Sequence, residues 1–452
     1  MRIAVINGSP KGHNSITLQY VNALQKVFPE HTFTFHHVAA EIRRIEKEKT
    51  ISVMGEDMAA SDFVLWAFPV YYTLVPGQLK RFVELVEEND ITPYFSGKPS
   101  CALSTSVRFF DHSAHEYIHE ISERWDMHVF DGYSCQMDDL LNAQKRQKFF
   151  DYFHAIFRLA QRRMWPRRRN ERQTPLSLRS LKLPVPTPIS GPERKVVIVS
   201  TPQSENSSLG QMISYFKQCF PFPVQHWELT PQVLKSGCLG CLKCVVDNVC
   251  AIHDECSGNL RRDLLDADAL VWATPIRDGF LDARFKMFMD RRFMEGHCPV
   301  TEGKILGWIL SGPLRQLPNT RFLLQSFSDM LGMRMFGPIT DEDPSEETAR
   351  LLTLLADVIV QGSWPQPSPT FFQVAGRKLF RDFVWSNSAI FSADHRFYKE
   401  HDFYDFPQKD LSKRLQNLGL HMAFSLPFVR KVTWPNIVRI MVAPYRKVVE
   451  KL

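Results

Sequence analysis

The chain repeats itself over most of its length, and this repeat constrains the possible folds more than any other feature. Trp66-Ala-Phe-Pro-Val is matched 206 positions later by Trp272-Ala-Thr-Pro-Ile, and Lys80-Arg-Phe is matched at the same distance by Lys286-Met-Phe. Asn14, closer to the start of the first copy, is matched by Asn206, an offset of 192. The repeat therefore predicts two domains with the same fold. The second copy has 14 extra residues between the positions of Asn206 and Trp272.

Each copy alternates short apolar runs with amphipathic, helix-like stretches. Short buried strands separated by helices are typical of a parallel sheet with helices on both faces. We therefore predict an α/β protein with two doubly wound, five-stranded parallel sheets in tandem. The expected strands are Ile3 to Ile6, Thr32 to Val38, Phe63 to Phe68, Ser100 to Ser104, His128 to Tyr133, Lys195 to Ser200, Val224 to Leu229, Ala269 to Thr274, Lys304 to Ser311 and Arg334 to Ile339.

The length of 452 residues agrees with two domains of roughly 150 residues and additional segments. We assign the first domain to 1–163, a basic, Pro-rich linker to 164–193, and the second domain to 194–363. Residues 364–452 are aromatic and basic, and they predict a helical extension packed on the second domain or at a subunit interface. A homo-oligomer is an open alternative.

The charge and the termini restrict the cellular setting. The chain has 55 basic and 49 acidic residues, and this small excess indicates no nucleic-acid partner. We find no secretory leader and no apolar run of the roughly 18 residues that a membrane span needs. We therefore expect a cytoplasmic protein. The amphipathic, basic end from Phe428 to Lys451 leaves weak membrane association as an alternative.

Two polar loops follow predicted strands of the first copy. The turn from Asn7 to Ser15 precedes a helix, where backbone N–H groups and the helix dipole favour an anion such as phosphate. Tyr71 and Tyr72 follow the third strand and offer flat rings to a planar ligand near the edge where parallel sheets bind ligands. The alternative interpretations are an ordinary helix cap for the first loop and a capped core for the tyrosines.

These loops resemble the NADPH-dependent FMN reductase branch of the flavodoxin-like superfamily. The resemblance covers roughly residues 1–160 and 194–362, and it implies that FMN binds the first copy. It assigns phosphate contacts to Ser9, Lys11, Asn14 and Ser15, and ring contacts to Pro69, Val70, Tyr71 and Tyr72, with Thr105 and Ser106 as further candidates. In the second copy Arg277 and Asp278 replace the tyrosines, so a second FMN and a degenerate domain both remain open.

Four of the nine cysteines lie within thirteen positions of the second copy, inside its extra segment. Their spacing, C-x2-C-x2-C-x5-C, favours a 4Fe–4S cluster, because such clusters take four thiolates from compact runs. Zinc and free redox-active thiols are the alternatives, and Cys256 competes for the fourth position. The expected ligands are Cys238, Cys241, Cys244 and Cys250. The run resembles that of the iron–sulfur flavoprotein subgroup.

The resemblance implies an oxidoreductase in which FMN and a 4Fe–4S cluster transfer electrons from NAD(P)H or a ferredoxin to an unknown acceptor. A small molecule or a ferredoxin-like protein is the expected redox partner. The alternatives are a non-catalytic electron carrier or redox sensor, and a zinc-stapled structural protein. No arrangement of side chains in the sequence nominates a catalytic acid or base.

Overall fold

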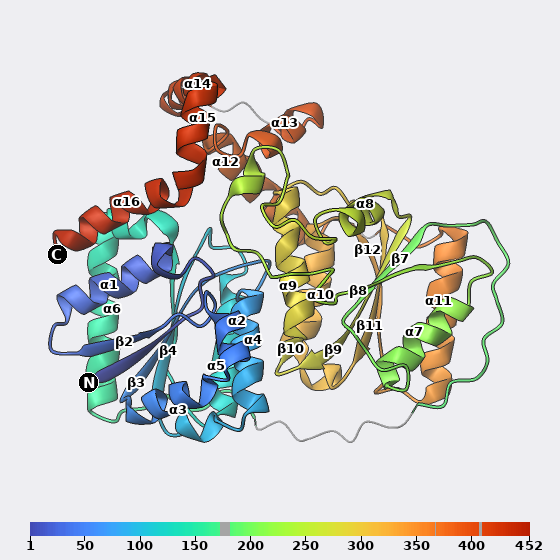
Figure 1. Cartoon of the computed structure of the whole chain (residues 1–452), viewed down its shortest axis with the longest axis horizontal. Coiled ribbons are helices and arrows are strands. Elements are labelled where there is room, and N and C mark those ends of the chain that lie inside the picture. The colour runs from blue at the N-terminus through green and yellow to red at the C-terminus, as the bar shows by residue number, and fades with distance from the viewer. Residues whose placement is uncertain (172–180, 367, 406–408) are drawn as a thin grey trace.

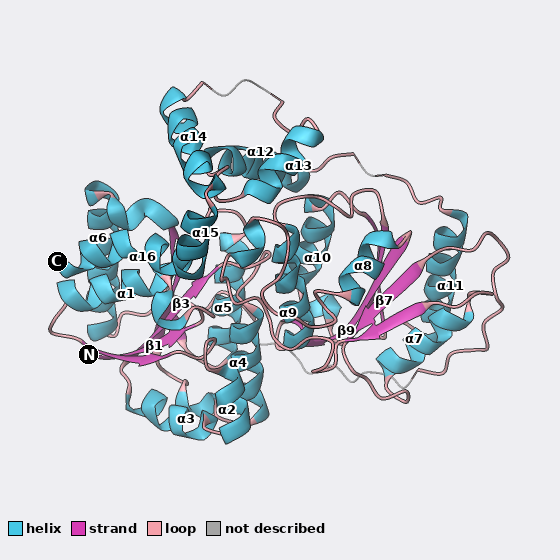
Figure 2. Cartoon of the chain, turned by 45° about the horizontal axis from the view of Figure 1, so that its top comes forward, coloured by secondary structure: helices cyan, strands magenta, loops and turns pink. Residues whose placement is uncertain are grey.

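The structure is a computed structural model, and it describes residues 1–171, 181–366, 368–405 and 409–452. Two α/β domains lie side by side, and a helical C-terminal extension lies above them (Figure 1). Part of the predicted linker, residues 172–180, lies outside the described residues. Figure 2 shows helices on both faces of each sheet, as the alternating sequence pattern predicts.

The first sheet has the strand order β2-β1-β3-β4-β5, with all neighbours parallel. This is the flavodoxin-like order 2-1-3-4-5. The strands are β1 (Arg2–Asn7), β2 (Thr32–His36), β3 (Phe63–Pro69), β4 (Pro99–Ser106) and β5 (His128–Val129), and β6 (Tyr133–Gln136) also pairs with β4.

Alternate residues of these strands face opposite layers of helices, as the two-residue period of a strand requires. Ile3 and Val5 share one apolar core with α1 (Ile16–Val27) and α6 (Ala143–Gln161). Ala4 and Ile6 belong to the core on the other face. The helices there are α2 (Ile42–Glu48), α3 (Ile51–Ala60), α4 (Gly77–Glu88) and α5 (Asp111–Arg124).

The second sheet repeats this topology. Its order, β12-β11-β9-β7-β8, is the same arrangement read from the opposite edge. The strands are β7 (Val196–Ser200), β8 (Gln225–Glu228), β9 (Ala269–Arg277), β11 (Ile305–Ser311) and β12 (Arg334–Thr340), and the short β10 (Phe280–Leu281) pairs antiparallel with β9. The helices are α7 (Ser208–Gln218), α8 (Asn259–Asp266), α9 (Ala283–Arg291), α10 (Pro318–Met330) and α11 (Ser345–Gln361).

The prediction of two parallel α/β sheets is confirmed, but each sheet has a short sixth strand that the five-strand count missed. In the first copy the run from His128 to Tyr133 is interrupted and continues as β6. In the second copy β9 runs on to Arg277 and turns back as β10. Two-residue strands such as β5 and β10 are too short for an apolar alternation to indicate them.

The two domains pack through α4 and α9, which occupy equivalent positions in the repeat. Each helix carries an acidic residue that caps the other helix. The Gly77 N–H donates to Oδ2 of Asp290 at 2.7 Å, and the Ala283 N–H donates to Oε1 of Glu84 at 2.7 Å. Both capping residues and both capped residues are 206 positions apart, so the domains are related by an approximate two-fold arrangement.

Each capping carboxylate also pairs with a lysine one turn earlier in its own helix. Nζ of Lys80 lies 2.8 Å from Oε1 of Glu84, and Lys286 pairs in the same way with Asp290. All four side chains are at most 1% exposed. A carboxylate at a helix N-terminus is stabilised by the helix dipole and by the unpaired N–H groups there. The repeat therefore builds one buried, reciprocal polar network at the domain interface.

The C-terminal extension contacts both domains. Its helix α12 (Phe371–Ser386) packs on α10 of the second domain, as expected, but its last helix α16 (Ile437–Glu450) packs on α1 of the first domain. Ile437, Val442 and Tyr445 of α16 are buried in that contact. The other helices of the extension are α13 (Ser392–Glu400), α14 (Leu411–Ser425) and α15 (Pro427–Thr433). The extension thus packs on both domains, whereas the sequence predicted packing on the second domain or at a subunit interface.

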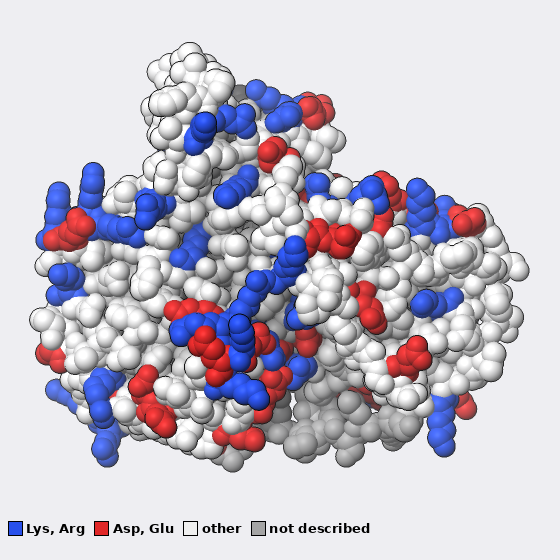
Figure 3. Space-filling view, viewed as in Figure 1, with Lys and Arg blue, Asp and Glu red and all other residues white. Residues whose placement is uncertain are grey.

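The surface agrees with the small net charge. In Figure 3, acidic and basic side chains are interspersed over the face that it shows. The basic run of the linker is partly paired with the first domain, since Nη1 of Arg168 lies 3.2 Å from Oδ1 of Asp126 and the Arg169 N–H donates to Glu123. Among the described residues, no helix is long and apolar enough to cross a membrane.

Candidate functional site

A cavity of about 290 Å³ lies where β1, β3 and β4 of the first domain end. Its wall is completed by loops of the second domain and by the C-terminal extension. Ligands of open parallel sheets bind beyond the carboxyl ends of the strands, and small-molecule pockets have volumes of about 300–1,000 Å³. The cavity thus has the position, and roughly the size, of a cofactor site.

Nine of the ten predicted cofactor-binding residues line this one cavity. They come from three loops, and they are Ser9, Lys11, Ser15, Pro69, Val70, Tyr71, Tyr72, Thr105 and Ser106. The tenth residue, Asn14, does not line it. Its Oδ1 accepts a hydrogen bond from Nη2 of Arg446 at 2.9 Å, on the side where α16 packs. The structure therefore places Asn14 in a contact with the extension and not in the cavity.

The first loop joins β1 to α1. Ser15 is the N-cap of α1, and its Oγ accepts from the Leu18 N–H at 3.4 Å. Lys11 lies next to the cysteine-containing loop of the second domain, because a Cβ at Gly240 would come within 2.6 Å of its Cε. Burial lowers the pKa of Lys11, and the nearby Cys238 and Cys241 oppose this effect. The loop thus offers hydroxyls, a helix N-terminus and one amine to an anion.

The second loop is held in place partly by the second domain. The Tyr71 N–H donates to the Leu74 carbonyl at 2.8 Å, and the following residues Tyr72 and Thr73 have positive φ angles of 35° and 68°. Nζ of the buried Lys286 donates to the Tyr71 carbonyl oxygen at 2.9 Å. The buried polar network at the interface therefore fixes the backbone of the cavity wall.

The tyrosine rings also contact the second domain. The Phe293 ring lies 5.2 Å from the ring of Tyr71, edge to face, and 4.6 Å from the ring of Tyr72. Burial raises the pKa of Tyr71 well above its usual value, so the hydroxyl is neutral over the physiological range. The sequence left two roles open for the tyrosines, contact with a planar ligand and packing over a core. In the structure they line the cavity and also pack against the neighbouring domain.

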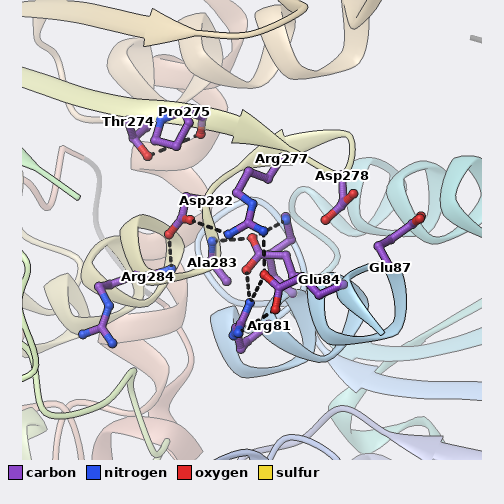
Figure 4. Close-up of polar contacts among 12 residues, drawn as sticks. Arg81, Glu84, Glu87, Thr274, Pro275, Arg277, Asp278, Asp282, Ala283 and Arg284 are labelled. Atoms are coloured by element: carbon purple, nitrogen blue, oxygen red, sulfur yellow. Dashed lines mark hydrogen bonds and ion pairs between the residues drawn. The ribbon is translucent and has the colours of Figure 1, made fainter. Parts of the chain in front are cut away.

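The second copy uses the equivalent turn differently. Its β9–β10 turn also has positive φ angles, at Asp278 and Gly279, but Arg277 pairs with Glu88 of the first domain at 2.5 Å. Figure 4 shows the Arg277 side chain directed toward α4, which carries Arg81 and Glu84. Asp278 pairs with Arg124 at 3.3 Å. The positions that carry cavity-lining rings in the first copy thus carry interdomain ion pairs in the second. This arrangement does not fit a second flavin.

The four predicted metal ligands lie on the cysteine loop, residues 229–258, between β8 and α8. The loop is anchored by two hydrogen bonds of 2.9 and 2.8 Å from Arg291 to Asp254. It is also tied to the first domain, since Nε2 of Gln78 donates to the Cys238 carbonyl at 3.0 Å. Cys238 and Cys244 line the cavity, so the loop covers the same site as the two polar loops.

The geometry of the cysteine loop agrees only in part with a metal site. The Gly240 N–H points at Sγ of Cys238 at 3.3 Å, and the Ile252 N–H points at Sγ of Cys250 at 3.5 Å, as is usual for cluster ligands. Within the described residues, however, no three His, Cys, Asp or Glu side chains are arranged to hold a metal ion. Cys256, the competing ligand, is a buried core residue. The metal assignment therefore rests on the spacing of the four cysteines and on these two N–H contacts.

The remainder of the cavity wall was not predicted from the sequence. It contains His297 of the second domain and aromatic residues of the extension, among them Phe380, Phe383 and Phe391. The one available signal was the aromatic richness that follows Trp364, and it has no spacing that indicates a ligand.

Comparison with known proteins identifies the class of the first domain. Residues 1–138 match the family model of NADPH-dependent FMN reductase. The resemblance to this family is thus confirmed for the first copy, over residues 1–138. No curated protein matches the chain.

Several solved structures are similar to one domain of the chain. An FMN-dependent NADH-azoreductase from Bacillus anthracis str. Ames Ancestor is 12% identical, covers 35% of this chain and 100% of its own, and has a TM-score of 0.29. General stress protein 14 from Treponema denticola is 11% identical, with 35% and 98% coverage and a TM-score of 0.29. Smu.1420 from Streptococcus mutans UA159 is 15% identical, with 36% and 100% coverage and a TM-score of 0.27.

Proposed function

We propose that the protein is an oxidoreductase that binds one FMN per chain in the cavity of the first domain and takes electrons from NAD(P)H or a reduced ferredoxin. The observation that carries this proposal is the meeting of nine predicted residues, from three loops, in one cavity at the strand ends. The family match of residues 1–138 supports it. The second copy contributes walls and not a second flavin site.

The residues of the first domain fit FMN. Ser9, Lys11 and Ser15 lie at the start of α1, where hydroxyls, the amine and the positive helix end would hold the phosphate. Backbone groups from Pro69 to Tyr72 and the hydroxyls of Thr105 and Ser106 would bind the edge of the ring. When bound, the flavin supplies both hydride transfer and single-electron transfer. The protein residues bind it and orient it.

We further propose that Cys238, Cys241, Cys244 and Cys250 bind a 4Fe–4S cluster. The support is the ligand spacing, the N–H groups directed at two of the sulfurs, and the position of the cysteine loop over the cavity. The Sγ atoms of these four cysteines would have to move closer together when the cluster forms. A cluster on this loop would lie beside the flavin site and would relay single electrons.

The first experiment is anaerobic purification followed by absorption spectroscopy and assays of FMN, iron, sulfide and zinc. We expect one FMN and about four irons per chain. Steady-state reduction of a quinone by NAD(P)H then separates an enzyme from an electron carrier, which would show almost no turnover alone. A protein that binds no FMN would overturn the proposed function. FMN without iron would overturn only the cluster, and bound zinc would assign the loop a structural role.

The cysteine loop can be tested with one substitution. Cys241→Ser should lower the iron and sulfide content at least tenfold and leave the FMN content near one per chain, because Cys241 does not line the cavity. Cys219→Ser, in a buried position of α7's end, is the matched control and should retain both cofactors. An unchanged iron content in Cys241→Ser would contradict the cluster assignment.

The phosphate site can be tested by comparing two residues of the same loop. Lys11→Met should weaken FMN binding about 10- to 100-fold, because a hydrogen bond to a charged group contributes about 1.5–3 kcal/mol. Asn14→Ala should change it less than about threefold, because the Asn14 side chain binds Arg446 outside the cavity. Titration of flavin-free protein with FMN measures both. Equal losses in the two variants would show that the phosphate lies elsewhere along the loop.

A further inference from the structure

Helix α14 of the C-terminal extension has little contact with the rest of the molecule. Figures 1 and 2 both show it outside the two α/β domains. Asp410 caps its start, since the carboxylate accepts from the Lys413 N–H at 3.0 Å. Among the described residues of α14 only Asn417 is buried, and its Nδ2 donates to the Trp385 carbonyl of α12 at 3.2 Å. Most of the helix surface is therefore open to solvent.

The open side of α14 is apolar. Four large apolar residues follow one another at steps of four, three and four positions, and this spacing places them on one face of a helix. Three more lie in the connection to α15 and on α15 itself, which contacts α14. These seven residues, each 53–76% exposed, form the apolar stripe: Leu411, Leu415, Leu418, Met422, Leu426, Phe428 and Val432. Gathered apolar side chains on a surface mark a site of interaction with a partner or a membrane.

The same part of the chain holds the whole excess of positive charge. Residues 411–449 include seven basic residues and no acidic one, which leaves 48 basic and 49 acidic residues in the rest of the chain. Arg430 and Lys431 are exposed on α15, next to the residues of the apolar stripe. In Figure 3 the projecting region where α14 lies is white, and basic side chains lie below it. An apolar face bordered by basic side chains is typical of helices that lie on a membrane.

The last helix, α16, contributes little to this surface. Its buried residues Ile437, Val442 and Tyr445 lie on the side that packs against α1 of the first domain. The sequence indicated the end from Phe428 to Lys451 as the part that could associate with a membrane. The structure covers much of that end and exposes α14 and α15 in its place.

The charge disfavours a second copy of this chain as the occupant of the apolar stripe. In a two-fold dimer the same surface lies on both sides of the interface. The basic residues of 411–449 would then face basic residues, and the segment has no carboxylate to pair with them. Like charges brought together in this way oppose association. Anionic lipid headgroups supply the missing negative charge, and the acyl region accepts the apolar side chains.

We propose that the apolar stripe, together with Arg430 and Lys431, docks the protein on a membrane surface that contains anionic lipids. At 1.5 Å per residue the 15 residues of α14 span about 22 Å, less than the roughly 30 Å of a bilayer core. The helix therefore lies in the interface, with its apolar face among the acyl chains and the basic side chains at the phosphates. This inference goes beyond the proposed function and does not depend on FMN in the cavity.

Flotation of the purified full-length protein with lipid vesicles is the main test. Vesicles of equal parts phosphatidylcholine and phosphatidylglycerol should bind the protein about tenfold or more tightly than vesicles of phosphatidylcholine alone, because each basic side chain near an anionic surface adds to the affinity. Added salt should weaken this binding, since it screens the charges. The comparison uses the wild type alone, so it holds whether or not a variant folds.

Leu415→Ser combined with Phe428→Ser tests the apolar stripe. The pair should lower binding to the acidic vesicles about tenfold or more, because less apolar surface enters the acyl region. Phe371→Ser combined with Val53→Ser is the matched control, since these two side chains are similarly exposed but lie on α12 and α3. The control should bind like the wild type. Equal losses in the two double variants would overturn the assignment to the apolar stripe.

Arg430→Gln combined with Lys431→Gln tests the charge. It should lower binding to the acidic vesicles about tenfold and leave binding to phosphatidylcholine vesicles unchanged. Arg43→Gln combined with Lys47→Gln, at exposed positions of α2, is the control and should bind like the wild type. A wild-type protein that stays in solution with both kinds of vesicle would overturn the proposal. If light scattering then shows a dimer that the double serine variant lacks, the apolar stripe binds a second copy.

Discussion

Lys286→Met is expected to lower the free energy of unfolding by about 3–5 kcal/mol, because removing one partner of a buried ion pair leaves the other charge without compensation. Lys286 and Asp290 are both completely buried. Burial lowers the pKa of Lys286 and raises the pKa of Asp290 to about 6, so each charge depends on the other. The lysine also donates to the Tyr71 carbonyl. Denaturant-induced unfolding, followed by circular dichroism, measures the loss.

The control removes both charges together. Lys286→Met combined with Asp290→Leu should recover most of the loss, since a buried ion pair and a well-packed apolar pair of similar volume are often close in stability. About 1–3 kcal/mol should remain, because the Gly77 N–H loses its acceptor. If the free energy of unfolding of the single variant falls by less than about 1 kcal/mol, water reaches the domain interface and the ion pairs there are not buried.

The buried network explains how one chain uses two copies of a domain. Asp290 caps α4, which follows the loop that carries Tyr71 and Tyr72, and Lys286 holds the backbone of that loop. The second copy also supplies Phe293 and the cysteine loop to the cavity wall. The first domain therefore contains the residues that we propose bind FMN, and the second domain completes the wall around them. This division agrees with the replacement of the tyrosine positions by Arg277 and Asp278 in the second copy.

The sheets were predictable because their signals are local. Apolar runs such as Phe63 to Phe68 mark buried strands, and the offset of 206 between Trp66 and Trp272 shows that the pattern occurs twice. Loops at the ends of such strands meet in any parallel sheet, so Ser9 and Tyr71 could be assigned to one site.

The rest of the site depends on contacts between distant residues. Arg446 binds Asn14 from 432 positions away, and Asp394 binds His297 from 97 positions away. No spacing in the sequence indicates either pair, because they exist only through the packing of the extension on the two domains. Likewise, the carboxylate that caps α4 belongs to the second copy, and the carboxylate that caps α9 belongs to the first. The sequence pattern within one copy cannot indicate such a contact between copies.

Exchanging the tyrosines for the residues of the second copy, Tyr71→Arg with Tyr72→Asp, is expected to weaken FMN binding at least 100-fold. The two turns share positive φ angles at equivalent positions, so the backbone accepts either pair of residues. The charges would face the cavity without the partners that Arg277 and Asp278 have, because the position equivalent to Glu88 is Met294 and that equivalent to Arg124 is Met330. Titration of flavin-free protein with FMN measures the effect.

Arg277→Gln is the matched control for this exchange. It breaks the ion pair with Glu88, but Arg277 does not line the cavity. FMN affinity should therefore change less than about threefold, although some stability is lost. Thermal unfolding of both variants separates the loss of the site from the loss of the fold. If the exchanged protein is folded and binds FMN like the wild type, the flavin ring does not lie against Tyr71 and Tyr72. The replacement of these tyrosines by Arg277 and Asp278 would then not explain why only the first copy binds a flavin.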